Sequence, residues 1–281
     1  MRRLIVNADD FGLHAAVNRG ILTAHTEGIV SSTSLMAGGA AFDDAVRIAK
    51  QCPQLGVGVH LTLVGARPVL PVAEVSSLLD EAGDFYGSYP LFIKRFLRGK
   101  IRLAEVEREL AAQIDRVRMA GIQPSHLDSH QHLHVLPGIG GLVLDLARRF
   151  SIRAIRIPAE PVAFIGATPA TVGRLAGRGG LTMLANLFRQ HAAAAGIRTS
   201  DHFFGMLAGG QLTEPALLAI LRRLPPGDSE LMTHPGVADE SLADAYRWGY
   251  QWDAERQALA APAVRELLVE RQIRLISFRE L

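Results

Sequence analysis

VNADDFG, residues 6–12, begins like a buried strand and then places two carboxylates, Asp9 and Asp10, side by side where that strand should end. An acidic pair in this position often caps a helix, because Asp accepts backbone N–H bonds and suits the positive end of the helix dipole. The pair can instead carry out chemistry, with a separate role for each carboxylate. Other segments of the chain favour the second interpretation.

Strand-like and helical segments alternate along the chain. Apolar runs predict strands within residues 4–8, 29–39, 55–63, 152–158, 229–234 and 273–278. Amphipathic patterns predict helices over residues 14–28, 41–53 and 105–121. This β-α alternation predicts an α/β fold with a mainly parallel sheet, either open or closed into a barrel.

The composition is that of an ordinary globular protein. The 281 residues are 48% hydrophobic and 21% charged, which suits one large domain or two small ones. A formal net charge of +2, without a basic tail, predicts no nucleic-acid partner. Cys52 is the only cysteine, so no internal disulfide is expected, and the N-terminal apolar run is too short for a membrane span or a secretion signal. We therefore expect a cytoplasmic protein.

Several histidines stand late in a predicted strand or in the segment after a helix: His60, His130 and His234. Ligands of parallel sheets and barrels bind at the carboxyl ends of the strands, so we expect these histidines to converge with the acidic pair on one rim. A purely structural role is the alternative for a lone strand histidine. Gly56 and Gly58, which share the His60 face by the period of two, leave room for a ligand.

The segment HLDSHQHLH, residues 126–134, concentrates imidazoles around a carboxylate. An extended chain would put all of its alternate residues on one side: His126, Asp128, His130, His132 and His134. A helix would instead align the histidines at every fourth position. Either cluster is costly unless it is solvated, hydrogen-bonded or bound to a metal, and a surface run of histidines is the alternative. Imidazole with carboxylate suits a divalent ion such as zinc.

These groups suggest a metal-assisted hydrolysis. One carboxylate of the acidic pair can bind the ion while its neighbour accepts a proton from water, whose pKa a metal lowers. A third group must protonate the leaving atom. His234, at the end of another predicted strand, is a candidate for this general acid.

Four motifs carry a family resemblance: VNADDFG, GVGVHLTL, HLDSHQHLHVLPG and THPG. In this order and at these separations they resemble the YdjC-type carbohydrate deacetylases, which belong with the polysaccharide-deacetylase-like barrels. The resemblance runs from residue 3 to the closing LISFREL. It implies a TIM-like (β/α) barrel, seven-stranded or incomplete, in a single deacetylase domain over residues 1–281, with an apolar insertion around 162–205.

The resemblance also implies roles for individual residues. It assigns Asp10, His60 and His130 as the metal ligands, Asp9 as the general base and His234 as the general acid. Arg156 resembles the arginine that steadies the base, and Asp128 and His132 are further candidates for contacts around the site. The implied cofactor is one divalent ion, Zn or Mg first, with Mn, Ni or Co as alternatives. No role follows for His126, His134, Asp201 or His202.

A narrower resemblance concerns the substrate. GARPVLPVAEV, IRAIRIPAEP and DHFFGMLAGGQLTEPALLAILRRLPPG are similar to the branch associated with hopanoid biosynthesis. This implies an N-acetylglucosaminyl hopanoid as substrate, with chito-oligosaccharides such as diacetylchitobiose as the alternative. The apolar and basic residues 89–102 and the apolar residues 162–188 then predict a hydrophobic lip with peripheral contact at the inner face of the membrane. Core helices or a homodimer contact are the alternative interpretation of both segments.

Two other classes of function stay open. A metal phosphoesterase would need ligands for a second ion, for which the surplus histidines 126, 132 and 134 are available. A non-catalytic sugar-binding or lipid-binding protein could share the same fold. Such a protein is expected to lose Asp9 or His234, and this chain keeps both.

Overall fold

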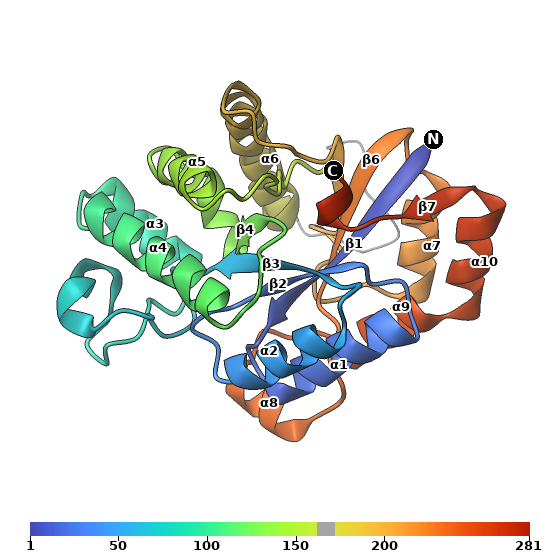
Figure 1. The fold of residues 1–281 in the computed structure, drawn as a ribbon, viewed down its shortest axis with the longest axis horizontal. Helices are drawn as coiled ribbons and strands as arrows, with labels where there is room; N and C mark the ends of the chain where they lie inside the picture. The colour runs from blue at the N-terminus through green and yellow to red at the C-terminus, as the bar shows by residue number, and fades with distance from the viewer. Residues whose placement is uncertain (162–171) are drawn as a thin grey trace.

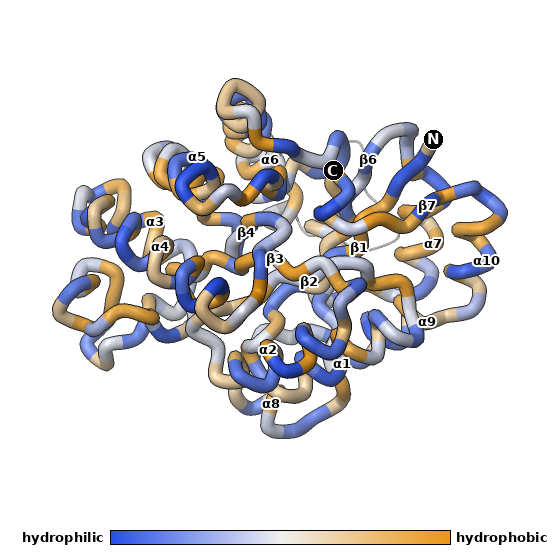
Figure 2. Tube along the Cα trace, viewed as in Figure 1, coloured by the Kyte–Doolittle hydropathy of each residue, from blue (hydrophilic) through white to orange (hydrophobic). Residues whose placement is uncertain are grey.

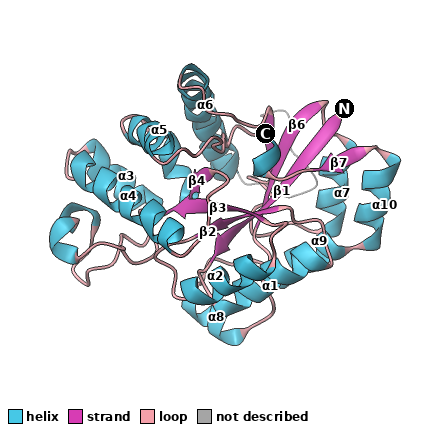
Figure 3. Ribbon diagram, viewed as in Figure 1, coloured by secondary structure: helices cyan, strands magenta, loops and turns pink. Residues whose placement is uncertain are grey.

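A curled sheet of seven parallel strands forms the centre of the molecule (Figure 3). The computed structural model describes residues 1–161 and 172–281, so residues 162–171 of the predicted insertion lie outside the described part. The strands are β1 (Arg2–Phe11), β2 (Ser32–Leu35), β3 (Gly56–Leu61), β4 (Leu127–Ser129), β5 (His202–Phe204), β6 (Gly227–Thr233) and β7 (Ile273–Leu275). Their order is β4-β3-β2-β1-β6-β5, and β7 also pairs with β1.

Helices follow most strands and cover the outside of the sheet (Figure 1). The α-helices are α1 (Ala15–Thr26), α2 (Phe42–Gln51), α3 (Tyr89–Leu97), α4 (Leu103–Met119), α5 (Ile139–Arg149), α6 (Val172–Ala194), α7 (Glu214–Arg222), α8 (Glu240–Ala245), α9 (Trp252–Ala260) and α10 (Pro262–Glu270). Short 3-10 turns are η1 (Val72–Glu74), η2 (Ser76–Leu78), η3 (His130–Val135) and η4 (Phe278–Glu280). The predicted TIM-like α/β barrel is therefore confirmed.

The two edges of the sheet are joined through one irregular segment. Ile155 forms a single bridge to Leu127 of β4, and its neighbour Ala154 forms another to Arg198, just before β5. The strand predicted over residues 152–158 is thus reduced to these two bridges. Strand β5 was not predicted, because its three residues follow Asp201 and give too short an apolar run. The closing segment matters for the site because Arg156 comes next on it.

The alternation of β1 separates two apolar regions. Leu4, Val6 and Ala8 belong to the large core between the sheet and the helices. Ile5 points the other way and packs with Ala154, Ile276 and Phe278, which fill the amino end of the barrel interior. In Figure 2 the surrounding helices mix hydrophilic and hydrophobic residues, as helices with one buried face do.

Helix α4 has a buried polar stripe that holds the chain after β3. Glu105, Glu109 and Gln113 recur at every fourth position and are buried. The Gln113 carboxamide accepts the Thr62 N–H at 2.8 Å and donates to the Thr62 carbonyl at 2.7 Å. Glu109 accepts the Val69 N–H at 2.8 Å. The strand that carries His60 is therefore fixed at its carboxyl end by paired hydrogen bonds.

Helix α3 lies within the apolar and basic segment 89–102. Phe92 is fully buried and stacks on Phe96 with ring centroids 6.3 Å apart, so for Phe92 the interpretation as a core residue is correct. Tyr89, Leu91 and Leu97 are 49%, 44% and 78% exposed. Within residues 1–161 and 172–281, no helix combines the length and the apolar character needed to cross a membrane.

Close approach of two backbones gives a prediction about stability. A Cβ added at Gly20 in α1 would lie 2.2 Å from the Gly236 Cα, so Gly20→Ala forces the helix away from the chain that follows β6. We expect the free energy of unfolding to fall by about 1–3 kcal/mol. Urea titration followed by circular dichroism measures this change.

The matched control is Gly141→Ala in α5, where an added Cβ meets nothing within 4 Å. This variant should be as stable as the wild type or more stable by up to about 1 kcal/mol, because alanine loses less backbone entropy in a helix. Equal effects of the two substitutions would show that the contact between α1 and Gly236 is not tight.

Candidate active site

An irregularity at the end of β1 turns both adjacent carboxylates into the barrel. The pairing of β1 with β2 shifts register between Ala8 and Phe11, and Asp10 has a φ of 64°, in the left-handed region that Asp tolerates. In a regular strand, neighbouring side chains point to opposite faces. Here Asp9 and Asp10 both approach His60: their nearest oxygens lie 4.0 Å and 3.3 Å from its Nε2.

The capping interpretation of this acidic pair is wrong. The N-cap of α1 is His14, whose Nδ1 accepts the Ala16 N–H at 3.1 Å. Asp9 and Asp10 belong to β1 and are 2% and 1% exposed. Their carboxylates are therefore available for chemistry inside the barrel.

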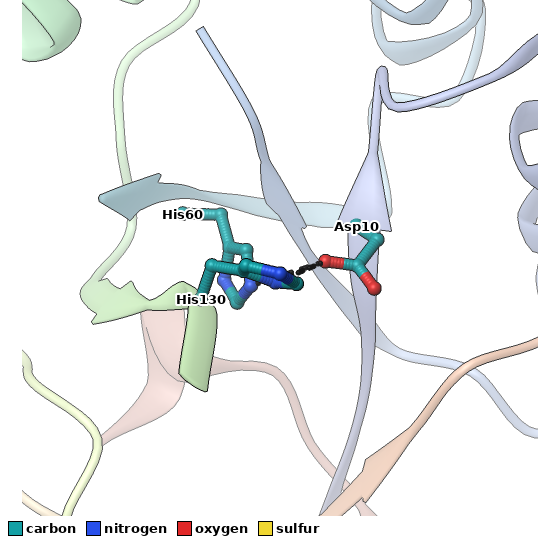
Figure 4. A group of neighbouring side chains, drawn as sticks. All are labelled: Asp10, His60 and His130. Atoms are coloured by element: carbon teal, nitrogen blue, oxygen red, sulfur yellow. Dashed lines mark hydrogen bonds and ion pairs between the residues drawn. The ribbon is translucent and has the colours of Figure 1, made fainter. Parts of the chain in front are cut away.

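Asp10, His60 and His130 form a buried cluster (Figure 4). The Asp10 Oδ1 lies 3.0 Å from the His130 Nδ1 and 3.3 Å from the His60 Nε2. Burial alone would raise the pKa of Asp10, but the two imidazoles hold it well below its ordinary value. Among the described residues, the buried Asp10 Oδ2 and His130 Nε2 have no hydrogen-bond partner.

Asp128 on β4 orients His60 through the ring nitrogen that faces away from Asp10. The His60 Nδ1 donates to the Asp128 Oδ1 at 2.9 Å, which leaves Nε2 directed toward Asp10. Burial by itself would lower the pKa of His60, but Asp128 and then Asp10 raise it to about 10. A carboxylate behind an imidazole is the usual arrangement around a histidine that binds a metal.

Arg156 connects three buried carboxylates and is itself fully buried. Its Nη1 and Nη2 donate to Asp9 at 2.6 Å and 2.7 Å, a two-pronged contact with both oxygens. Nη1 also lies 2.8 Å from Asp128, and Nε donates to Glu230 at 2.6 Å. Burial opposes its charge, but these carboxylates raise the pKa of Arg156 well above its ordinary value.

Sequence reasoning missed three polar neighbours of this network. Glu230 lies in β6, and burial raises its pKa to about 7. Asn7 donates to Asp9 at 2.9 Å and to Ser34 at 2.8 Å, and Ser34 donates to Asp128 at 2.7 Å. The sequence does contain a signal for Glu230 and Asn7: each is a charged or amide side chain inside an apolar strand, and such a group needs a buried partner.

The remaining histidines of residues 126–134 are engaged elsewhere. Both nitrogens of His126 contact serine hydroxyls, and its ring fills the space beside Gly58 that the sequence left for a ligand. His134 accepts from Ser129 and donates to the Arg156 carbonyl. Burial lowers the pKa of His126 to about 3 and that of His134 to about 4, so both are neutral.

Neither predicted geometry describes the whole HLDSHQHLH segment. Residues 126–130 alternate as an extended chain, and then Gln131 and His132 adopt φ values of 56° and 58°. After this left-handed turn the His132 ring packs against Phe203, with ring centroids 6.0 Å apart, and it lines the same cavity as His60 and His130. Burial lowers the pKa of His132 well below its ordinary value, so a positive charge there is disfavoured.

His234 follows β6 and lines the same cavity as His60. Its backbone N–H donates to the Glu255 carboxylate at 2.6 Å, and its ring contacts Tyr250 edge to face at 4.9 Å. Its Nδ1 has no hydrogen-bond partner in the described part of the chain. Asp201 and His202, in contrast, lie at the amino ends of β5 and β6, away from His234. Asp201 accepts a hydrogen bond from the Asp228 N–H, and His202 pairs with Ser229.

A cavity of about 560 Å³ opens beside these residues. Its polar end contains Asp9, His60, His130 and His234. Most of the remaining lining is apolar, with Ile93, Leu133, Leu136, Leu181, Leu184, Met206 and Leu207 among it, and it also includes the polar side chains of Tyr89, Gln131, His132 and Arg178. A ligand with one polar and one apolar part fits this division.

The donors suit a single divalent ion. Among the described residues, two sets of three side chains could hold one ion: Asp10 with His60 and His130, or Asp9 with His60 and Asp128. Arg156 already contacts Asp9 and Asp128, whereas Asp10 Oδ2 and His130 Nε2 have no partner among the described residues. Because a buried polar atom without a partner is costly, the first group fits a metal better.

Comparison with known proteins gives consistent matches over the whole chain. The family model for YdjC-like protein matches residues 3–270. A carbohydrate deacetylase of Geobacillus stearothermophilus is 35% identical over 99% of this chain and 98% of its own length. A chitooligosaccharide deacetylase of Enterobacter sp. (strain 638) is 31% identical, with coverage of 99% and 98%. A crystal structure from Enterococcus faecalis, of a protein with a proposed role in cellobiose-phosphate cleavage, is 30% identical with a TM-score of 0.79, covering 99% and 98%.

The pKa of His60 predicts a proton release when zinc binds. A pKa raised from 6.5 to about 10 means that the protonated imidazole stabilises the metal-free fold fully below pH 6.5, and this contribution is lost as the pH rises through 10. Zinc requires the neutral imidazole, so binding at pH 8 should release about one proton. Calorimetry in buffers of different ionisation enthalpy measures the number.

His191→Ala, on the exposed face of α6, is the control and should release the same number of protons as the wild type. Zinc binding without proton release at pH 8 would contradict the assigned charge of His60.

Proposed function

Because the chain belongs to the YdjC-like family, we propose that this carbohydrate deacetylase uses one divalent metal ion to remove the acetyl group from an N-acetylated sugar. The observation that carries the proposal is the buried group Asp10, His60 and His130 beside a carboxylate, Asp9, that Arg156 holds in place. We also propose that residues 1–281 form one deacetylase domain.

Asp10, His60 and His130 are the proposed ligands. Two imidazoles and one carboxylate favour zinc, with Mg as the other leading candidate and Mn, Ni or Co as alternatives. When bound, such an ion polarises the amide carbonyl and makes water more acidic. Asp128 keeps the His60 Nε2 directed toward Asp10 by accepting from Nδ1, so that Nε2 would be available to hold such an ion.

Asp9 is the proposed general base. Arg156 contacts both of its oxygens, and Asn7 donates a further hydrogen bond to Oδ1, so the carboxylate cannot rotate away. Oδ2 lies 4.0 Å from the His60 Nε2, on the side of the proposed ligands. A proton removed from the attacking water would therefore pass to a carboxylate of fixed position.

His234 is the proposed general acid. Its ring lines the cavity, and its Nδ1 has no hydrogen-bond partner among the described residues. The Glu255 carboxylate holds its backbone N–H, and the Tyr250 ring packs on its imidazole. A protonated His234 in this position can donate to the amine nitrogen as the C–N bond breaks.

Single substitutions separate metal binding from proton transfer. Asp9→Asn should lower kcat by at least about 100-fold and leave the zinc content unchanged, because the proposed ligands are intact. Asp10→Asn, His60→Ala and His130→Ala should each lose zinc. Acetate release and metal analysis of the purified proteins measure both properties.

Asp145→Asn is the matched control, since this carboxylate lies on α5 with its side chain 74% exposed. It should keep the wild-type rate and metal content. Near-normal rates together with full zinc content in any of the three ligand variants would reject the proposed ligand set.

For the substrate, we propose a lipid-linked sugar, an N-acetylglucosaminyl hopanoid. The apolar part of the cavity supports this, because Ile93 of α3 and Leu181 and Leu184 of α6 line it next to the polar end. Diacetylchitobiose is the alternative, in line with the chitooligosaccharide deacetylase among the relatives. A free chito-oligosaccharide would leave this apolar wall without a complementary group.

We further propose a cytoplasmic protein that contacts the inner face of the membrane. Exposed Leu91 and Leu97 of α3, and Met183 and Leu187 of α6, lie on the two helices that flank the apolar part of the cavity. Lys94 and Arg98 add positive charge to α3 and its C-terminus. Such a surface suits an anionic lipid interface. A homodimer stays a prediction from the sequence.

The two substrates can be distinguished by a substitution in the cavity. Leu181→Asn places an amide in the apolar wall, so kcat/KM for the N-acetylglucosaminyl hopanoid should fall at least about tenfold. The value for diacetylchitobiose should change by less than about threefold. Acetate release from both compounds measures the effect.

Val269→Asn, on α10 and 80% exposed, lies outside the cavity lining and the proposed membrane surface; it is the control and should change neither value. An equal fall in kcat/KM for both substrates would contradict a lipid-binding role for the apolar wall. Acetate release from diacetylchitobiose alone would instead identify chito-oligosaccharides as the substrates.

A metal phosphoesterase finds less support in the structure. The two groups that could hold an ion share His60, so the described residues offer one ion site at a time. Of the three histidines that the sequence left available for a second ion, His126 and His134 have both nitrogens in hydrogen bonds, and His132 belongs to neither group.

A further inference from the structure

Four aromatic rings follow one another in residues 246–252 and form a continuous group. They are Tyr246, Trp248, Tyr250 and Trp252, and we call them the aromatic segment. Successive ring centroids lie 5.0 Å, 5.4 Å and 5.5 Å apart. Apart from the contact of Tyr250 with His234, the proposed reaction does not involve these rings; the first three lie between helices α8 and α9, and Trp252 begins α9.

Two glycines hold the aromatic segment against the barrel. A Cβ at Gly210 would lie 2.3 Å from the Tyr250 ring, and one at Gly236 would lie 2.9 Å from the Trp252 Cβ. The Gln251 N–H also donates to the Gly210 carbonyl at 2.6 Å. Tyr250 and Trp252 are therefore packed closely against the loops that carry these glycines.

Two of these rings contact residues of the proposed reaction, one a proposed metal ligand and the other the proposed general acid. Trp248 lies over His130, with ring centroids 5.3 Å apart and planes inclined by 35°. Tyr250 contacts His234 at 4.9 Å and lines the cavity. Trp248 and Tyr250 are half-buried, whereas Trp252 is 7% exposed. Part of each ring is therefore exposed, and Trp248 lies beside the cavity, in contact with two residues that line it, His130 and Tyr250.

We propose that Trp248 and Tyr250 form the wall on which the sugar ring stacks during deacetylation. This inference rests on the proposed function. An equatorially substituted pyranose presents ring C–H groups on one face, and the negative face of an aromatic ring attracts them. The acetamido group must reach Asp10, His60 and His130, so the ring that carries it lies within reach of Trp248.

The wall also explains where the sugar nitrogen lies. With the acetyl carbonyl at the proposed ligands, the amine must face His234, and Tyr250 packs directly on that imidazole. Trp248 and Tyr250, 5.4 Å apart and inclined by 65°, then contact neighbouring parts of one ring. Trp248 acts as a substrate-binding residue that selects for a sugar, with no role in proton transfer.

Kinetics of two Trp248 variants test the wall. Trp248→Ala should raise KM for diacetylchitobiose at least tenfold, with kcat within threefold of the wild type and zinc affinity unchanged. Trp248→Phe keeps an aromatic face and should bring KM back to within threefold. If Trp248 only supported His130, the alanine variant would lose zinc affinity and kcat instead, and that result would overturn the proposal.

Fluorescence gives a second readout that does not depend on turnover. The chain has two tryptophans, Trp248 and Trp252, and both lie in the aromatic segment. Zinc-loaded protein is mixed with diacetylchitobiose in a stopped-flow instrument, and emission is recorded before acetate appears. The Trp252→Phe variant, which keeps Trp248, should show an emission change, and the Trp248→Phe variant should show none. Sorbitol, which has no ring, is the control ligand.

The outcomes separate this inference from the proposed function. Normal turnover by the wild type together with an unchanged KM in Trp248→Ala rejects the wall and keeps the deacetylase. Absence of turnover on every N-acetylated sugar rejects the function. In that case an emission change from Trp248 still supports sugar stacking, and a constant emission rejects it.

Discussion

The buried guanidinium of Arg156 is the group on which the rest of the site depends. Asp9, Asp128 and Glu230 are each at most 2% exposed, and three carboxylates so close together would repel one another without a cation. Arg156 contacts all three through Nε, Nη1 and Nη2. This single positive charge offsets only part of the negative charge; burial also raises the pKa of Glu230 to about 7, and Asp128 accepts a hydrogen bond from the His60 imidazole.

The buried carboxylates differ in whether they contact Arg156. Asp9 and Asp128 face Arg156 and are held in place, whereas Asp10 faces the imidazoles of His60 and His130. The irregular end of β1 makes the division possible, because it turns two adjacent residues into the same interior. A regular strand would have sent one of them into the helical layer.

Much of the fold could be predicted from apolar periodicity, and the site only in part. The runs containing His60 and His234 are long enough to indicate strands, and their carboxyl ends do meet at one cavity. The positive φ of Asp10 could not be predicted, since local sequence allows Asp either backbone region. Glu230 was missed for another reason. Its partner Arg156 is 74 residues away in sequence and on the segment that closes the barrel, so their pairing appears only in three dimensions.

The central claim is that Arg156 leaves Asp10, and neither Asp9 nor Asp128, as the carboxylate for the metal. Anomalous scattering at the zinc edge from crystals of the zinc-loaded protein tests this most directly. The account predicts one strong peak in contact with Asp10, His60 and His130. A peak between Asp9, His60 and Asp128, with Arg156 displaced from both carboxylates, would contradict it.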